Sequence, residues 1–423
     1  MLLKTTQRRY FRGGVNLERI QRDIETLSRF NATPGNGVTR FSYSQQDKQA
    51  RDYLMNEIKE LGLEIRVDAV GNIRARLEGN NKDGPVVMTG SHIDSVRNGG
   101  RFDGVLGVVG ALEAIRVIKE QNIKTNNPIE LVIFAEEEGS NFGSTLLGSK
   151  FMVGRYTVDD LKKLKNSDGK TAYQVIKEFG LGINNYSAMG FKPSEIKCMI
   201  ELHIEQSVVL DKAELSIGIV EAIAGMKTLR MVFRGVANHA GATPMGLRQD
   251  PMVAAGEAIM FIEKLAKEKA YPSTVATVGR ISCLPNVPNV IPGEVAISVD
   301  VRDVKSEGID IIISELEKEI KQIAKARRLD YEFQIIGQSE PVVLSADVVK
   351  AIEDTVKEKG YSYMRMNSGA VHDACMLADI VPVGMIFVPS INGRSHVPEE
   401  YTRYEDIKKG CDVLLGTVIK MAE

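Results

Sequence analysis

Apolar residues follow two different patterns along the chain, and the first pattern covers its N-terminal half and its C-terminal end. Residues 46–61 and 106–120 have the apolar spacing of three to four residues that amphipathic helices show. Short continuous apolar runs lie at 85–89, 129–135, 199–202 and 383–388. Such runs between helices are typical of strands buried in a largely parallel sheet. We therefore expect an α/β domain with a mixed sheet and helices on both faces.

The pattern changes near residue 214, where strictly alternating segments begin. Alternation marks the segments 228–234, 295–301 and 331–335, and helical spacing marks 309–327. Asp250 and Pro251 suit the N-cap and the first turn of a further helix that runs to about residue 269. This order predicts a small ferredoxin-like α+β domain. We expect residues 214–330 to be inserted into a larger domain formed by residues 1–213 and 331–423.

Composition narrows the class of protein without naming a function. Hydrophobic residues make up 43%, and 54 Lys+Arg nearly balance 56 Asp+Glu, so no basic field attracts nucleic acid. No apolar stretch is long enough to span a bilayer. The four cysteines are widely spaced, which fits a reducing cytoplasm. The basic N-terminal segment lacks the apolar core of a signal peptide, and we expect it to be a loosely packed end.

All five histidines lie in short motifs rich in polar or glycine residues. They are His92, His203, His239, His372 and His396. Histidine is the commonest metal ligand and a frequent acid/base group. The placement of every copy beside carboxylates or glycines indicates a metal-dependent enzyme.

The first two motifs follow the ends of predicted strands. In Gly90-Ser-His-Ile-Asp94, His92 can ligate a metal while Asp94 orients its ring. In the following Gly-Gly-Arg-Phe-Asp-Gly run, Asp103 offers a carboxylate that can bridge two cations. The alternative is a plain strand end followed by a glycine turn.

Three glutamates, Glu136, Glu137 and Glu138, follow the strand at 129–135. Adjacent carboxylates repel one another unless cations or protons relieve them. One of them can be a ligand and its neighbour a general base. A solvated acidic turn is an equally common alternative.

His203 and His396 complete a ligand set of histidines and carboxylates with His92, Asp103 and Glu138. The alternative for each lone histidine is an ordinary structural role. A set without thiolates suits a borderline divalent metal such as Zn, Mn, Co or Ni.

Two candidate residues lie in the predicted insert. His239 is surrounded by small residues, where it can donate a hydrogen bond to a developing oxyanion. Arg302 ends an alternating strand, where it can hold a carboxylate bidentately. Alternation alone favours a plain surface arginine at this position.

Together these motifs resemble the hydantoinase/carbamoylase branch of the M20 metallopeptidase-like amidases. The branch includes N-carbamoyl-L-amino acid hydrolases, allantoate amidohydrolases and β-ureidopropionases. The resemblance runs from about residue 17 to the end of the chain. It rests on Gly-Ser-His-Ile-Asp-Ser-Val, Gly-Gly-Arg-Phe-Asp-Gly-Val, Glu-Glu-Glu-Gly-Ser, His-Ile-Glu-Gln, Asn-His-Ala-Gly-Ala-Thr-Pro-Met, Asn-Val-Ile-Pro-Gly, Ser-Gly-Ala-Val-His-Asp-Ala and the final Ser-His.

The resemblance implies a role for each matching residue. A set of two divalent cations would be held by His92, Asp103, Glu138, His203 and His396, with Asp103 bridging. The resemblance makes Glu137 the general base and Asp94 the support of His92. It places His239 and Asn289 at the tetrahedral centre, with His239 reaching the partner subunit of a homodimer formed through the insert. Arg302 would take the substrate carboxylate, and Gln206, Gly369 and His372 would lie on the substrate side.

The sequence departs from the branch at three positions near the expected pocket. Ser207 replaces a usual glycine, Asn141 a usual arginine, and Val371 a usual glycine. None of them is a ligand or the base, so they bear on the identity of the substrate rather than on catalysis.

The resemblance implies hydrolysis of the ureido C–N bond of an N-carbamoyl-L-amino acid. Allantoate amidohydrolase is the first alternative, and the Pro-Ser-Ile-Asn-Gly run at 389–393 leans towards it. β-Ureidopropionase, a dipeptidase and a catalytically silent binding protein on the same scaffold are the others. The expected partners are a small ureido substrate and a second copy of the chain.

Overall fold

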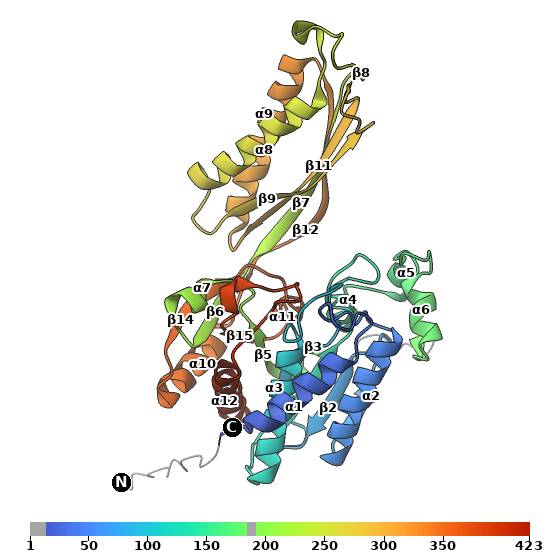
Figure 1. Ribbon diagram of the computed structural model, residues 1–423. Helices are drawn as coiled ribbons and strands as arrows, with labels where there is room; N and C mark the ends of the chain where they lie inside the picture. Colours follow the sequence, from blue (N-terminus) through green and yellow to red (C-terminus); the bar gives the residue numbers. More distant parts are fainter. Residues whose placement is uncertain (1–13, 184–191) are drawn as a thin grey trace. The chain divides into compact units, whose positions relative to one another are not determined.

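The computed structural model describes residues 14–183 and 192–423, which divide into two compact units (Figure 1). The first unit comprises the chain up to Glu221 with residues 344–366 and 372–423, and the second comprises residues 222–343 and 367–371. The second unit was expected at residues 214–330, whereas the main segment of the observed unit comprises residues 222–343. The strand that starts at Asp330 pairs within the second unit, and the strand at 217–223 pairs with the sheet of the first.

A nine-stranded mixed sheet forms the centre of the first unit and also takes in an edge strand at 342–343, which belongs to the second unit. Its order is β1-β2-β4-β3-β5-β15-β6-β13, and β14 also pairs with β6. The strands are β1 (Glu64–Val67), β2 (Ile73–Leu77), β3 (Val86–His92), β4 (Ile129–Phe134), β5 (Ile196–Ile204), β6 (Ile217–Ile223), β13 (Val342–Val343), β14 (Tyr363–Ser368) and β15 (Val383–Val388). The central strands β4, β3, β5 and β15 are mutually parallel and fully or almost fully buried. Burial on both faces explains their continuous apolar sequences.

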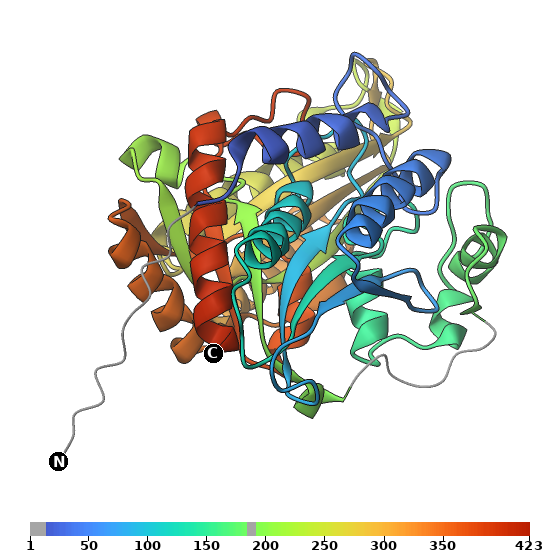
Figure 2. The ribbon, with the colours of Figure 1, turned by 90° about the horizontal axis from the view of Figure 1, so that it is seen from below.

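Helices connect and cover these strands. They are α1 (Leu17–Arg29), α2 (Gln45–Glu60), α3 (Val105–Glu120), α4 (Leu147–Met152), α5 (Val158–Leu161), α6 (Ala172–Glu178), α7 (Val209–Ala213), α10 (Ala346–Lys359), α11 (Asp373–Ala378) and α12 (Tyr404–Ala422). Short 3₁₀ turns lie at Pro193–Glu195 and Ile391–Gly393. Figure 2 shows α1, α3 and α12 side by side over the sheet.

The two sides of strand β15 show that helices cover both faces of the sheet. Neighbouring residues of a strand point to opposite faces. Val388 packs against Gly410 of α12, whereas the Phe387 ring lies 5.8 Å from that of His372, the N-cap of α11. The predicted coverage of both faces is therefore confirmed for this part of the sheet.

The second unit has the element order β7-α8-β9-β11-α9-β12 of the ferredoxin-like motif. Its elements are β7 (Gly225–Arg234), β8 (Asn238–His239), the 3₁₀ turn Met245–Leu247, α8 (Pro251–Glu268), β9 (Val275–Leu284), β10 (Val290–Ile291), β11 (Glu294–Asp303), α9 (Ser306–Arg327) and β12 (Asp330–Ser339). The antiparallel sheet order is β12-β7-β11-β9. As predicted, the Asp250 carboxylate caps α8 by accepting from the backbone N–H of Met252.

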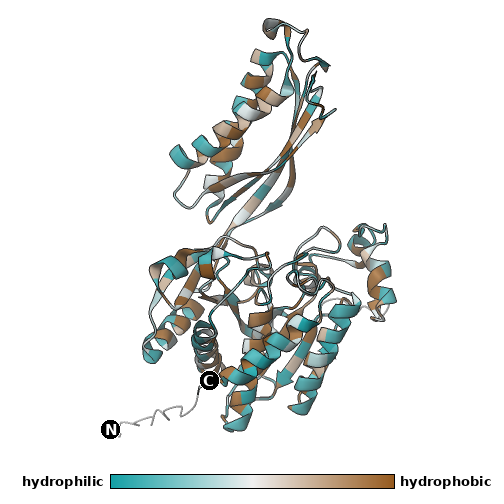
Figure 3. Cartoon of the chain, in the orientation of Figure 1, coloured by the Kyte–Doolittle hydropathy of each residue, from teal (hydrophilic) through white to brown (hydrophobic). Residues whose placement is uncertain are grey.

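Alternation along β11 sets the packing of this unit. Val295, Ile297, Val299 and Val301 are buried in one core with residues of α8 and α9, while the residues between them are half-buried. Figure 3 shows the resulting mixture of hydrophobic and hydrophilic residues along both helices and strands.

Three further expectations concern the whole chain. The basic N-terminal segment lies outside the described residues. No helix among the described residues is both long and apolar enough to cross a membrane. All four cysteines are unpaired.

Candidate metal centre

The carboxyl edge of the parallel strands gathers the predicted ligands of the first unit. His92 ends β3, the three glutamates follow β4, His203 lies near the end of β5, and His396 follows β15. Ligand sites of α/β sheets form at this edge because the parallel strands end there together. Residues far apart in the sequence thus meet in one site.

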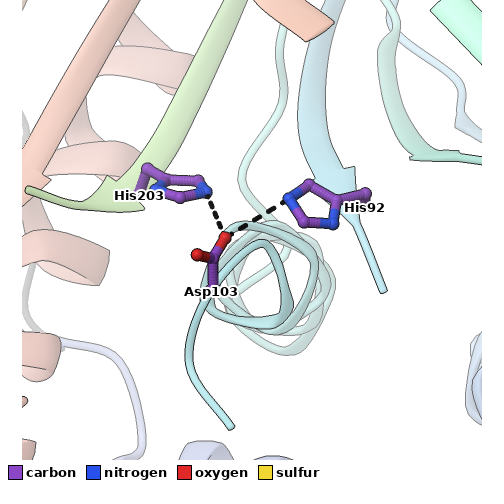
Figure 4. A group of neighbouring side chains, drawn as sticks. All are labelled: His92, Asp103 and His203. Carbon is purple, nitrogen blue, oxygen red and sulfur yellow. Dashed lines mark ion pairs between the residues drawn. The ribbon is translucent and has the colours of Figure 1, made fainter. Parts of the chain in front are cut away.

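Asp103 is the shared centre of this site. Its Oδ1 lies 3.5 Å from His92 Nε2 and 3.3 Å from His203 Nε2, and Figure 4 shows both rings pointing at that one oxygen. Its Oδ2 lies 3.2 Å from His396 Nε2, which is in turn 3.4 Å from Glu138 Oε2. The two carboxylate oxygens therefore face two different sets of ligands.

The two sets differ in their access to solvent. The side chains of His92 and His203 are only 2% and 1% exposed, whereas that of His396 is 47% exposed. We call the group of His92, His203 and Asp103 Oδ1 the inner set. We call the group of His396, Glu138 and Asp103 Oδ2 the outer set.

Main-chain contacts fix both inner imidazoles for metal binding. Nδ1 of His92 lies 3.1 Å from the Asp94 carbonyl oxygen, and Nδ1 of His203 lies 2.9 Å from the Ile204 carbonyl oxygen. A carbonyl oxygen only accepts, so each Nδ1 carries the hydrogen. The Nε2 lone pairs are left facing Asp103, as in histidine metal ligands. The Gly104 N–H also donates to His203 Nε2, at 3.1 Å, so that nitrogen is an acceptor in the neutral ring.

The buried carboxylates also indicate a site for cations. Glu138 Oε1 is buried without a hydrogen-bond partner, although a buried polar atom is normally paired. Histidine nitrogens and carboxylate oxygens without thiolates suit borderline divalent cations. The residues present therefore fit the implied metal group.

Electrostatics at the site favour positive charge. Burial on its own would raise the pKa of Asp103, but hydrogen bonds from the three histidines, when these are protonated on both ring nitrogens, hold it well below its usual range. Burial and the Asp103 charge raise the pKa of Glu138 to about 7. The hydrogen bond to Asp103 raises the pKa of His396 to about 9, against the effect of burial. The buried carboxylates of this cluster thus attract positive charge.

Gly104 allows Asp103 to approach His92. Its φ of +66° lies in the left-handed region that favours glycine, and a Cβ there would overlap the imidazole of His92. Helix α3 begins immediately afterwards, so the glycine joins the ligand to the helix start.

Asp94 holds the glutamate loop. Its Oδ1 accepts from the N–H of Glu137 and its Oδ2 from the N–H of Glu138, each at 3.1 Å. The carboxylate itself is 3.7 Å from His92 Nδ1, so its backbone carbonyl makes the closer contact with that ring. The sequence predicted contact with His92 but not the support of both glutamates.

Glu137 lies beside the inner set. Its Oε2 is 3.7 Å from His92 Nε2, and its side chain is buried. Burial raises the pKa of Glu137 well above its usual range, against the opposing effect of His92. The position and the raised proton affinity suit a group that takes up a proton.

Gln206 and His372 also lie at the site. Gln206 Nε2 donates to Asp103 Oδ2 at 2.7 Å. The His372 ring meets that of His203 edge-on, with 4.6 Å between centroids. Burial and the nearby His203 charge lower the pKa of His372 well below its usual range. A ring kept neutral in this way suits a packing partner of the ligand.

Two residues at the site were missed by the sequence analysis. Ser395 Oγ lies 2.9 Å from Asp103 Oδ2 and 2.9 Å from Glu400 Oε2. Glu400 Oε1 accepts from the N–H groups of Phe102 and Asp103, at 2.9 and 3.1 Å. Ser395 precedes the predicted ligand His396, and Glu400 lies in a run of two glutamates. Neither sequence pattern predicts a contact with residues about 300 positions away in the chain.

The second unit contains the other four predicted residues. His239 pairs with Val290 across β8 and β10, and the Asn289 carbonyl oxygen accepts from the Ala240 N–H at 3.0 Å. His239 Nδ1 accepts from the N–H groups of Gly241 and Ala242, at 3.0 and 3.2 Å. When neutral, His239 therefore carries its hydrogen on Nε2, on an exposed side chain.

Arg302 and Gly369 are joined directly. Arg302 Nη1 donates to the Gly369 carbonyl oxygen at 2.9 Å, and its Nε donates to Asp300 Oδ1 at 2.7 Å. The pair with Asp300 links two residues on the same face of β11. A guanidinium has five N–H donors, so donors remain for a further acceptor.

The structure places the three residues that differ from the branch pattern, Asn141, Ser207 and Val371. Asn141 donates from its backbone to Glu136 Oε1 at 2.8 Å and from Nδ2 to the Ser42 carbonyl oxygen at 2.9 Å. Ser207 is exposed, and Val371 is half-buried. Asn141 thus belongs to the loop that carries the glutamates.

The fold and the site define an α/β protein with a cluster of histidines and carboxylates that could hold divalent cations. The chain matches the family described as Peptidase family M20/M25/M40 over residues 88–420. It belongs to that family, as its motifs predict.

Individual relatives show which members of the family the chain resembles. The chain is 38% identical over 398 residues to the N-carbamoyl-L-amino-acid amidohydrolase of Paenarthrobacter aurescens, covering 94% of this chain and 96% of the relative. It is 34% identical over 403 residues to the allantoate amidohydrolase of Escherichia coli (strain K12), covering 95% and 97%. Its fold matches an amidase of the hydantoinase/carbamoylase family from Burkholderia multivorans with a TM-score of 0.90 and 34% identity, covering 97% and 98% of the two chains. The resemblance to the hydantoinase/carbamoylase branch is thereby confirmed.

Proposed function

We propose that this chain is a metal-dependent amidohydrolase that cleaves the ureido C–N bond of N-carbamoyl-L-amino acids. The name and the 38% identity of the Paenarthrobacter relative support this substrate class. The family membership supports hydrolysis, and the ligand groups of the first unit support divalent cations.

One observation carries the proposal of two cations. Asp103 presents one oxygen to His92 and His203 and the other to His396, which is paired with Glu138. A carboxylate with two separate ligand sets suits a bridge between two ions of a hydrolytic centre. The native ions would be Zn, Mn, Co or Ni, which share this preference for nitrogen and oxygen ligands.

Glu137 acts as the general base in this proposal. When bound, the cations lower the pKa of water and polarise the ureido carbonyl. Glu137 takes the proton of the attacking water and delivers it to the leaving nitrogen. Asp94 holds the main chain of Glu137 and so fixes the starting position of the carboxylate. One water and one ureido group give the free amino acid, ammonia and carbon dioxide, because the carbamate first released decomposes.

The second unit supplies the remaining groups and acts as a lid and a dimerisation domain. His239 Nε2–H and Asn289 donate to the oxyanion of the tetrahedral intermediate, with His239 serving the partner subunit of a homodimer. Arg302 binds the substrate carboxylate with the donors left by Asp300 and Gly369. Gln206 and His372 line the substrate side of the first unit.

The four cysteines form no disulfide, which supports a cytoplasmic location, since free thiols persist in a reducing compartment. Neither nucleic acid nor a membrane is a proposed partner.

Allantoate hydrolysis is the second candidate. It uses the same chemistry on a diureide, and the Escherichia coli relative at 34% identity supports it. Comparison of ammonia release from allantoate and from N-carbamoyl-L-amino acids separates the two candidates.

Ammonia release tests the function. The purified protein is stripped with a chelator, reloaded separately with Zn²⁺, Mn²⁺, Co²⁺ or Ni²⁺, and offered N-carbamoyl-L-amino acids, their D-enantiomers, N-carbamoyl-β-alanine and allantoate. We expect release from the L-compounds only. Faster release from allantoate would replace the first candidate with the second. No release from any compound with any ion would overturn the proposal.

A further inference from the structure

Glu400 connects the two loops that supply Asp103 and His396. Its side chain is buried, and the whole residue is 3% exposed. Its Oε1 accepts from the N–H groups of Phe102 and Asp103. Both donors precede the first turn of α3, where the helix has no side-chain cap. Glu400 therefore holds the main chain that carries the shared carboxylate.

The absence of a side chain at Gly100 leaves room for the Glu400 carboxyl group. A Cβ on Gly100 would overlap the Glu400 carboxyl group. The Gly-Gly-Arg-Phe-Asp-Gly run thus leaves room for a carboxylate from the far end of the chain.

Ser395 links Glu400 to Asp103. Its hydroxyl lies 2.9 Å from Asp103 Oδ2 and 2.9 Å from Glu400 Oε2. Together with the hydrogen bond from Gln206 to the same oxygen, these contacts restrict rotation of the Asp103 carboxylate, because Oδ2 must stay near the hydroxyl. Free rotation would exchange the oxygens that face the inner and outer sets.

The contact is asymmetric with respect to the two ligand sets. Ser395 touches only Oδ2, the oxygen 3.2 Å from His396 Nε2. Glu400 acts on the main chain, and so on both oxygens together. Loss of each residue should therefore have a different effect on the two sets.

We propose that Ser395 and Glu400 are positioning residues that orient Asp103 as the shared ligand. Ser395 orients Oδ2 for the cation of the outer set, and Glu400 fixes the main chain for both cations. This inference rests on the proposed two-cation site. Partners that orient metal ligands typically change metal affinity by about 10- to 100-fold when they are removed.

Zinc binding of the full chain tests the proposal without substrate. Chelator-treated wild type, Ser395→Ala and Glu400→Ala are titrated with Zn²⁺ alone, and bound zinc is measured by equilibrium dialysis. For Ser395→Ala we expect one affinity to fall about 10- to 100-fold while the other stays within about threefold. For Glu400→Ala we expect both affinities to fall.

Matched controls separate positioning from general damage. Glu399→Ala removes the neighbouring glutamate, whose side chain is 62% exposed and 3.6 Å from Arg394, and should bind zinc as wild type does. Ser395→Thr keeps a hydroxyl and Glu400→Gln keeps an acceptor oxygen, so each should recover most of the lost affinity. If Glu400→Ala does not unfold cooperatively in urea, the Ser395→Ala and Ser395→Thr pair decides.

Several outcomes would overturn the inference. They are unchanged zinc binding in Ser395→Ala, an equal loss at both sites in that variant, or no recovery with threonine. A wild type that binds fewer than two zinc ions would overturn the two-cation proposal itself. Two normal zinc sites without ammonia release would overturn the proposed function and leave this inference intact.

Discussion

The close approach of Gly104 to His92 gives a quantitative test of the site geometry. Gly104 has a φ of +66°, and a Cβ there would overlap the His92 ring. Gly62 has nearly the same φ of +65°, but a Cβ there would meet nothing within 4 Å. Alanine at the two positions thus compares left-handed strain with and without a clash in the metal centre.

The expected loss of stability follows from these two contributions. Left-handed strain destabilises either alanine variant by about 1–2 kcal/mol. At Gly104 the ring must also retreat by about 1 Å to reach the ordinary contact distance of about 3.5 Å. Such overpacking adds about 1–3 kcal/mol. We therefore expect losses of about 1–2 kcal/mol for Gly62→Ala and about 2–5 kcal/mol for Gly104→Ala.

Urea unfolding of the chelator-treated proteins measures the stability difference. Zinc titration and ammonia release then report the position of His92. A displacement of about 1 Å at a reacting centre lowers turnover by about 100-fold, which we expect for Gly104→Ala and not for Gly62→Ala. Equal stability of the two variants, with normal zinc binding in Gly104→Ala, would refute the described approach of Gly104 to His92.

Three further predictions test other parts of the proposal. Arg248 donates to the carbonyl oxygens of Ala240 and Thr243 in the loop that carries His239. We therefore expect Arg248→Ala to weaken the preference of His239 for the Nε2–H tautomer, which ¹⁵N NMR measures. The variant should also lose turnover while it binds as much zinc as wild type. An unchanged histidine spectrum would contradict that role. Zinc at 100 times its dissociation constant should raise the free energy of unfolding by about 2.7 kcal/mol per site, and a chelator should reverse this. No stabilisation by any of the four ions would argue against the centre. Mixing Glu137→Gln with His239→Ala subunits should restore activity at one site of each mixed dimer, and no rescue would argue against a shared site.

Much of the fold could be predicted because burial leaves a direct mark on the sequence. Val295, Ile297, Val299 and Val301 alternate because one face of β11 packs against two helices. The short strands β1 and β14 were missed, since their residues are mostly exposed or half-buried and show no apolar run.

The boundaries between the units were harder to predict. The predicted boundary after residue 330 cuts through the strand at 330–339, because the sequence of this strand does not show which sheet it joins. Its pairing with β7 is a contact across about 100 residues of chain.

The meeting of the five candidate ligands could be predicted because each lies in a recognisable motif that follows or ends a buried strand. Ser395 and Glu400 could not be predicted, because their roles depend on hydrogen bonds between loops distant in sequence. The pairing of Arg302 with Asp300 was also missed, although two residues of spacing put both on one face of the strand.

The position of Glu137 gives the most direct test of the proposed function. Glu137→Gln keeps the size of the side chain and removes the proton acceptor, while Asp94 still holds its main-chain N–H. Bound zinc and ammonia release from an N-carbamoyl-L-amino acid are measured side by side for wild type and variant. We predict that Glu137→Gln binds as much zinc as wild type and loses nearly all turnover. A variant that retains full turnover would contradict the assignment of Glu137 as the base.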